Sequence, residues 1–434
     1  MIKKILTAAV LFFAAASAAF AEDDALLASL IAAADKQNPM ITAAAEQVAA
    51  ARERLKVSEA KLGPSASLVG AGLFINGGVN KEINFMGMTN TFGVLDSQTY
   101  AAAVVLTQSI YSGGSLQAKR QSDKIALDAA EASAERTREG VENSVRRAYY
   151  AHRCAQAKVF VAEEACRLSK NHQKDAEKLF AAGVVALNDV LRSKVAVAEA
   201  ELNVIRMKNA ADITEAALRR AVGADLPQEI KQSEKLETLL SASDVKKDII
   251  KADLDTALKN RKELKAYTLL SEQAKKLAEA AKGQSLPQIL GLAGYGTLGK
   301  DAFSSENTEP FAVLQLTWSL YNGGEVKAKT AEAQANARRL LACLEDMKNI
   351  IRMEITQAAS SSSSAQSRLE VARRQLAQAR EDYRIAQRRY TESVGTNLDA
   401  LDARLALTNS MTEVVTAVYD IKTAEADIIY AMGQ

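Results

Sequence analysis

The tetrapeptide Tyr111-Ser112-Gly113-Gly114 returns as Tyr321-Asn322-Gly323-Gly324, 210 residues further along the chain (321 − 111 = 210). The same offset relates further pairs after each copy: Ala118-Lys119 with Ala328-Lys329, Asp189 with Asp399, and Ala221-Val222-Gly223 with Ala431-Met432-Gly433. One offset held from Tyr111 to Gly223 indicates an internal duplication. Because solenoid repeats run to roughly 20–50 residues, a unit of this length is half of a duplicated domain.

Residues 1–21 have the pattern of a secretory signal peptide. Lys3 and Lys4 precede the apolar stretch Ile5–Ala18, and Ala19-Phe20-Ala21 has the small-x-small form of a cleavage site. Cleavage removes two of the 55 basic residues and leaves 53 (55 − 2 = 53), equal to the 53 acidic residues. A neutral mature chain argues against a nucleic-acid partner.

The composition favours long helices and offers no disulfide. Proline occurs only five times in 434 residues, and no second apolar run is long enough for a membrane helix of about 18 residues. Cys154 and Cys166 are twelve residues apart in a helical stretch, roughly 18 Å, which is too far for a disulfide. We interpret these two and Cys343 as small packing residues.

The repeat divides the mature chain into a first half (22–227), a linker (228–252) and a second half (253–434). Each half is predicted to contain a helix, two strands, a very long helix of roughly 100 Å and a return helix. Period-two alternation predicts the strands at about 65–76, 99–110, 288–298 and 310–319. The polar range 77–98 is interpreted as a loop. In the first return helix a spacing of four and three predicts a coiled-coil seam of Leu191, Val195, Ala198, Leu202 and Ile205.

The fold class follows from the four strands. A strand of about ten residues is long enough to cross a bilayer when tilted, but four strands cannot close a barrel, for which about eight are needed. An open sheet in lipid would leave unpaired backbone groups at its edges. We therefore expect a mainly α-helical protein with a shared membrane β-barrel, in which three copies supply twelve strands and the long helices form a tunnel.

This arrangement resembles the TolC-like outer-membrane efflux proteins over nearly the whole mature chain. The motifs that carry the resemblance are Leu106–Gly114 and Leu316–Gly324, similar to the family's strand-to-helix junctions, and Gly183–Leu191 and Val394–Ala403, similar to its two helical tips. The resemblance implies a homotrimer in the outer membrane of a Gram-negative bacterium, in contact with lipid. It also implies an exit duct for efflux or type I secretion, working with a periplasmic adaptor and an inner-membrane transporter.

The resemblance also implies roles for single residues. Gly183, Val184, Val394 and Gly395 are expected at the tips that meet the adaptor, and Asp399 and Asp402, with Asp189, at a carboxylate gate. The alternative for these carboxylates is that they favour a helix N-terminus by about 0.3–1 kcal/mol. Two departures stand out: Ser393 occupies the place that matches Gly183, and Asn397 replaces a basic residue that can follow the second glycine in the family.

Two rival classes are weaker. Gly294-Tyr-Gly296-Thr-Leu-Gly299 has dinucleotide-type glycine spacing, but no helix is predicted after it, so we expect no cofactor and no enzyme. His152 and His172, the only histidines, lie twenty residues apart on one helix and cannot share a metal; we expect solvent-facing or tip-facing positions.

A secreted or periplasmic coiled-coil scaffold without a pore explains the helices but not the paired strands. Heat-modifiable migration and outer-membrane partition would be absent from such a scaffold.

Overall fold

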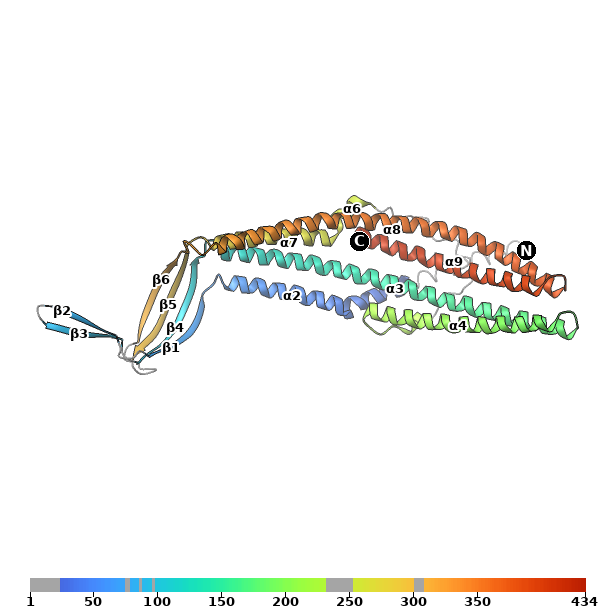
Figure 1. The fold of residues 1–434 in the computed structure, drawn as a ribbon, viewed down its shortest axis with the longest axis horizontal. Coiled ribbons are helices and arrows are strands. Elements are labelled where there is room, and N and C mark those ends of the chain that lie inside the picture. Colours follow the sequence, from blue (N-terminus) through green and yellow to red (C-terminus); the bar gives the residue numbers. More distant parts are fainter. Residues whose placement is uncertain (1–23, 75–78, 86–87, 96–97, 232–252, 300–307) are drawn as a thin grey trace. The chain divides into compact units, whose positions relative to one another are not determined.

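The computed structural model describes residues 24–74, 79–85, 88–95, 98–231, 253–299 and 308–434 (Figure 1). The predicted signal peptide, residues 1–21, and most of the predicted linker, residues 228–252, lie outside the described residues. Among the described helices, none combines the length and the apolar character that crossing a membrane requires.

Each half of the chain ends in two long helices that follow its strands. After a helix through residues 24–37, the first half contains α2 (Pro39–Ala60), β1 (Ser65–Phe74), β2 (Val79–Phe85), β3 (Met88–Leu95), β4 (Gln98–Tyr111), α3 (Ser115–Ala181) and α4 (Leu187–Val222). The short helices η1 (Gln228–Lys231) and α6 (Leu254–Asn260) follow. The second half contains α7 (Lys262–Gly283), β5 (Gln288–Gly299), β6 (Thr308–Thr317), α8 (Glu325–Thr391) and α9 (Asn397–Met432).

The long helices reproduce the duplication residue by residue. Helices α3 and α8 both have 67 residues, and α4 and α9 both have 36. Their starts differ by 210 in both cases (325 − 115 and 397 − 187). Both return helices end on a left-handed glycine, Gly223 with φ 77° and Gly433 with φ 70°, which closes a helix without steric cost.

Strands β1, β4, β5 and β6 form an antiparallel sheet in the order β1-β4-β5-β6. The central pair, β4 with β5, joins the two halves of the chain. Ser65 lies opposite Thr107, and Gln288 lies opposite Thr317, so the two halves pair their own strands in the same register. Strands β1 and β6 are the two ends of this sheet within the described residues.

The range 77–98, interpreted above as a loop, contains a second antiparallel pair, β2 with β3, in which Val79 lies opposite Leu95 and Phe85 opposite Met88. The range contains valine, isoleucine, phenylalanine and threonine, all of high strand propensity. These residues outweigh the glycines and asparagines on which the loop interpretation was based.

The chain forms two compact units. The hairpin unit comprises Met1–Ala45, Ser133–Lys262 and Met347–Gln434, and the sheet unit comprises Glu46–Ala132 and Glu263–Asp346. The largest core cluster of the hairpin unit joins α3, α8 and α9, with Val161, Leu369 and Met411 among its members. In α4 the predicted seam faces away from this core: Leu191, Val195, Leu202 and Ile205 are all exposed.

Candidate functional site

The first helical tip, between α3 and α4, turns on Gly183. Its φ of 74° lies in the left-handed region that favours glycine, and a Cβ at this position would meet nothing within 4 Å. The neighbouring Val184 is exposed. Gly183 is therefore required by the backbone conformation of the turn, and the space around it is open.

At the second tip, between α8 and α9, the glycine has a different role. The left-handed residue is Ser393, with φ 61°, whereas Gly395 has an ordinary φ. A Cβ on Gly395 would lie 2.9 Å from the Cβ of Arg389, so close approach to the end of α8 requires the missing side chain. Val394, between them, is exposed.

Asp399 forms a capping box at the start of α9. Its backbone N–H donates to Thr396 Oγ1 at 3.1 Å, and its Oδ2 accepts from the backbone N–H of Thr396 at 3.3 Å. The hydrogen bond from Thr396 lowers the pKa of the Asp399 carboxyl. Asp402 is exposed and Asp189 half-exposed; for the Asp402 side chain the described part of the chain provides no hydrogen bond or ion pair. The cap explains Asp399 at this position whether or not it also belongs to a gate.

A buried polar contact joins the two helical hairpins just behind the tips. Asn397 donates from Nδ2 to the backbone oxygen of Asp189 on α4 at 3.1 Å, and its Oδ1 lies 2.7 Å from Nε2 of His172 on α3. Asn397 is 4% exposed and His172 is 2% exposed. The sequence singled out Asn397 only as a departure from a family pattern, and nothing in it pointed to His172 as its partner.

The expectation of solvent-facing or tip-facing histidines is wrong, because both imidazoles are buried between helices. His152 is as inaccessible as His172, at 2% exposed, and its Nδ1 lies 3.2 Å from Thr214 Oγ1 on α4. Burial lowers the pKa of His152, an effect that Glu215 partly opposes and Arg153 reinforces. Among the described residues, no three histidine, cysteine or acidic side chains are grouped to hold a metal.

Both strand-to-helix junctions of the sheet unit use paired left-handed glycines: Gly113 and Gly114 have φ 63° and 79°, and Gly323 and Gly324 have φ 65° and 85°. The first junction is also closely packed. A Cβ on Gly113 would lie 2.2 Å from the carbonyl oxygen of Gly283, at the end of α7. A Cβ on Gly323 would meet nothing within 4 Å.

The same asymmetry holds for the residues around the two junctions. Tyr111 is 44% exposed, whereas its counterpart Tyr321 is 88% exposed. In α3, Ala118, Ala129 and Ala132 are buried. Their counterparts in α8, 210 residues later, are exposed: Ala328, Arg339 and Ala342. The first junction is covered by α2 and α7, and the second has one face open.

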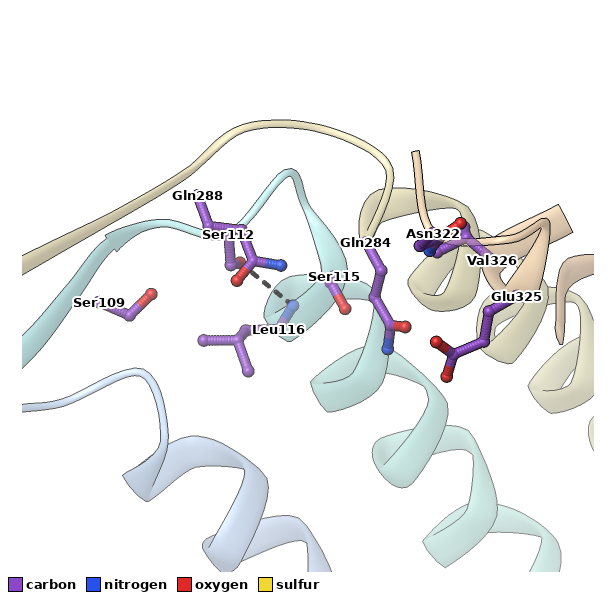
Figure 2. A pocket seen from close by; sticks show the side chains of 9 residues that line it. All are labelled: Ser109, Ser112, Ser115, Leu116, Gln284, Gln288, Asn322, Glu325 and Val326. Carbon is purple, nitrogen blue, oxygen red and sulfur yellow. Dashed lines mark hydrogen bonds between the residues drawn. The ribbon is translucent and has the colours of Figure 1, made fainter. Parts of the chain in front are cut away.

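A polar pocket of about 370 Å³ lies between the first turns of α3 and α8 (Figure 2). It is lined by Ser109, Ser112, Ser115, Gln284, Asn322 and Glu325, among others. Ser112 caps α3, because its Oγ accepts from the backbone N–H of Leu116 at 3.3 Å. Glu325 is paired with Lys329 at 2.5 Å, and this hydrogen bond lowers its pKa. The pocket therefore separates two helix starts and presents no unpaired charge.

The two faces of the sheet differ in polarity. One face carries exposed large apolar side chains, among them Leu68, Val104, Tyr295 and Leu314. The opposite face carries Ser65, Ser67, Thr107, Gln315 and Thr317, together with apolar residues that include Val69, Leu292, Phe311 and Val313. An exposed apolar face on a sheet is a contact surface for lipid or protein.

Comparison with known families decides what these features belong to. The family described as "Outer membrane efflux protein" matches residues 30–224 and 254–434, which cover both halves of the duplication. The chain belongs to this family. The match confirms the expected family and an export channel of the outer membrane as the class of protein, and the family is one of channels rather than enzymes.

Two relatives of this outer membrane efflux protein come from pseudomonads. It is 27% identical over 263 residues to the alkaline protease secretion protein AprF of Pseudomonas aeruginosa, a match covering 59% of the chain and 54% of AprF. It is 22% identical over 401 residues to the probable efflux pump outer membrane protein TtgC of Pseudomonas putida, covering 91% of the chain and 80% of TtgC. The chain thus spans about half the length of AprF.

Solved channels share the fold of this outer membrane efflux protein. The CmeC outer membrane channel of Campylobacter jejuni superposes with a TM-score of 0.78 at 16% identity, covering 94% of the chain and 85% of CmeC. The MtrE outer membrane channel of Neisseria gonorrhoeae superposes with a TM-score of 0.76 at 16% identity, covering 94% and 89%. These likenesses confirm the expected combination of long helical hairpins and strands.

Proposed function

We propose that this outer membrane efflux protein is the exit duct of a tripartite export system. A homotrimer passes substrates from an inner-membrane transporter, through a periplasmic adaptor, to the outside. The names of AprF and TtgC, a secretion protein and an efflux pump component, support this class of partner. The duct itself performs no catalytic step.

The open edges of the sheet carry the proposal. Strands β1 and β6 end the four-stranded sheet, and unpaired edges in lipid cost several kcal/mol for each unsatisfied group. Three copies give about twelve strands, enough for an open lumen, whereas about eight strands fill with side chains. In this ring the face with Leu68 and Leu314 contacts lipid, and the face with Ser67 and Gln315 lines the lumen.

The duplication supports this closure, because the pairing between the two halves within one chain indicates how β6 would pair with β1 of a second copy. Within the chain, β4 of the first half pairs with β5 of the second, and Gly113 packs on the end of α7. Residues of β1 and β5 correspond by an offset of 223 (288 − 65), and those of β4 and β6 by 210 (317 − 107). The open junction at Gly323 is thus the place for Ala60–Gly63 of a second copy, the counterpart of Gly283–Leu286.

The exposed seam of α4 supports the same assembly. Leu191, Val195, Leu202 and Ile205 form an apolar stripe at heptad spacing that the described residues do not cover. A seam of this kind is stabilised by a partner helix. We assign it to a helix of the neighbouring copy in the tunnel.

The register of the closure is testable by disulfide cross-linking. In the chain Thr107 lies opposite Leu292, so Thr317 should lie opposite Val69 of the next copy (107 + 210 = 317; 292 − 223 = 69). The pair Thr317→Cys with Val69→Cys, in a background where Cys154, Cys166 and Cys343 are replaced by alanine, should give linked species up to three copies. Thr317→Cys with Ser67→Cys is the control, two residues out of register. Cross-linking of the control alone overturns the register, and no linkage in either pair overturns closure by β1 and β6.

The exposed tip residues are proposed to contact the adaptor. Val184 and Val394 have exposed apolar side chains, and each follows a left-handed residue, Gly183 or Ser393, that shapes its turn. Val184→Asp and Val394→Asp should leave the trimer assembled and abolish export. Met40→Asp is a matched control, because Met40 is 63% exposed but lies beside Asn38, which bonds Ala221 at the opposite end of α4. If export continues in both tip variants, Val184 and Val394 are not required for contact with the adaptor.

A further inference from the structure

His172 is buried in α3 where the two helical hairpins of the hairpin unit meet. Its side chain is hydrogen bonded to Gln387 on α8 and Asn397 on α9, and Asn397 in turn bonds Asp189 on α4. The Tyr390 ring lies 4.8 Å away, centroid to centroid, in a tilted arrangement. The imidazole is thus a single hydrogen-bonding centre shared by both hairpins.

The atom facing Nε2 of His172 is an acceptor. Asn397 Oδ1 lies 2.7 Å from Nε2, and Asn397 Nδ2 donates to the Asp189 carbonyl oxygen at 3.1 Å. A carbonyl oxygen accepts but cannot donate, so the Asn397 amide cannot be reversed without losing this bond. Nε2 must therefore carry a proton to bond Asn397.

The atom facing Nδ1 of His172 is also an acceptor. Gln387 Oε1 lies 3.3 Å from Nδ1, and Gln387 Nε2 donates to Asp175 Oδ2 at 3.3 Å. Reversing the Gln387 amide would direct its oxygen at the Asp175 carboxylate, which only accepts. Nδ1 must therefore carry a proton as well.

A neutral imidazole has one N–H, and only the imidazolium donates at both nitrogens. The charged groups around it come from every helix of the contact. Asp175 on α3 and Asp189 on α4 favour a cation at this place. Arg404 on α9, which donates to Ser169 one turn before His172, opposes it, and Tyr390 on α8 is neutral. Burial opposes the charge, and the two acceptors that face its nitrogens favour the doubly protonated ring.

We propose that His172 is a proton-dependent clasp between the two hairpins: the imidazolium holds α3 to both α8 and α9 behind the tips, and loss of one proton releases one of these two bonds. The clasp therefore tightens at acidic pH and loosens as the pH rises. Its consequence for transport, a tip end that opens less readily at acidic pH, rests on the proposed function as a duct.

The other histidine of the chain is an internal control with the opposite pattern. Thr214 Oγ1 donates to the Ala211 carbonyl oxygen at 2.9 Å, so it accepts from Nδ1 of His152. Nε2 of His152 is buried and has no hydrogen-bond partner among the described residues. His152 therefore uses a single N–H, as the neutral ring provides, and leaves Nε2 without a partner among the described residues.

Nitrogen NMR of the full-length protein labelled only at histidine tests the protonation, because the chain has only two histidines. His152→Gln assigns the two sets of signals. At about pH 5.5 we expect two protonated ring nitrogens for His172 and one protonated and one bare nitrogen for His152. A bare nitrogen on His172 at this pH would overturn the clasp.

Amide hydrogen exchange of the α3–α4 and α8–α9 tips tests whether His172 holds the two hairpins together. At each pH we compare the exchange rate of His172→Gln with that of the wild type. The variant should exchange faster by on the order of tenfold at about pH 5.5 and at nearly the same rate at about pH 8, because it lacks one charge-assisted hydrogen bond. His152→Gln should not speed exchange at the tips at either pH. An equal ratio at both pH values for His172→Gln would overturn the clasp.

Conductance measured in a lipid bilayer distinguishes failure of the His172 clasp from failure of the proposed function as a duct. Wild-type current should be smaller at about pH 5.5 than at about pH 8, and His172→Gln should lose this difference. If neither protein carries current, the proposed function fails, while the exchange ratio still decides the clasp. If both carry current with the same pH dependence, control of the tip by His172 is overturned.

Discussion

Ser393 adopts the same left-handed backbone conformation as Gly183, its counterpart 210 residues earlier (393 − 183 = 210), with φ 61° against 74°. For a residue with a side chain this conformation is disfavoured by about 1–2 kcal/mol. One tip therefore holds strain that the other avoids.

Ser393→Gly should stabilise the protein by about 0.5–1 kcal/mol, because the strain relieved exceeds the added entropy of glycine in the unfolded chain. Gly183→Ala, at a position where a Cβ meets nothing within 4 Å, should destabilise it by about 1 kcal/mol through the backbone alone. Thermal unfolding of the detergent-solubilised protein measures both. Destabilisation by Ser393→Gly would show that the serine side chain, not the backbone, matters here.

The carboxylate gate can be separated from the helix cap by choosing asparagine. Asparagine at position 399 keeps an oxygen for the Thr396 N–H and removes the charge. Asp399→Asn with Asp402→Asn should therefore abolish cation preference and block by multivalent cations in single-channel recordings, without loss of stability. Asp399→Ala should in addition destabilise the start of α9 by about 1 kcal/mol. Unchanged selectivity in the asparagine pair leaves the cap as the only role.

A gate formed by Asp399 should keep its charge at acidic pH. The hydrogen bond from Thr396 lowers the pKa of Asp399 below that of an unfolded aspartate, about 3.9, so the carboxylate stays ionised above that value. Cation preference should accordingly be the same at about pH 8 and about pH 5.5 in the His172→Gln protein, where the clasp no longer varies. A loss of selectivity between these values would place the relevant charge elsewhere.

His152 should make the hairpin unit less stable in acid. Burial lowers its pKa below the value in the unfolded chain, about 6.5. As the pH falls below about 6.5, the unfolded chain therefore binds a proton that the folded chain does not yet bind. Stability is present above about pH 6.5 and falls below it, by at most about 1.4 kcal/mol per pH unit between the two pKa values. His152→Gln should remove this loss in thermal unfolding at about pH 5.5 against about pH 8. An identical loss in the variant would assign it to other groups.

A buried polar pair in the sheet unit has an apolar counterpart in the second half. Ser58 on α2 donates to the Asp123 carboxylate on α3, which Lys119 also contacts at 2.5 Å, and both Ser58 and Asp123 are buried. By the offsets of 223 and 210, the matching residues are Ala281 and Ala333. The duplication thus contains a natural double replacement.

Ser58→Ala should destabilise the protein by about 1.5–3 kcal/mol, because it removes a hydrogen bond to a buried charged group. Ser58→Ala with Asp123→Ala should recover most of this loss, since both polar groups are gone. Unfolding of the two single variants and the double variant forms a complete cycle. Additive losses would mean that the two side chains do not interact.

The sequence by itself determined the elements and their ends. A repeat offset of 210 residues, scarce proline and glycines at fixed places set the bounds of α3, α4, α8 and α9, because helix ends are local events of backbone conformation and capping. Alternation likewise located β1, β4, β5 and β6. The pair β2–β3 was missed, because strand propensity and turn residues compete within that short range.

Only the tertiary structure decided what those elements touch. Heptad spacing in α4 predicts that Leu191 and Val195 share a face, and the packing of α3, α8 and α9 decides that this face is exposed. His172 and Asn397 lie 225 residues apart in the chain and meet because two hairpins dock. The periodicity of a helix fixes which side chains share a face, but the partner of that face is chosen by contacts between elements distant in sequence.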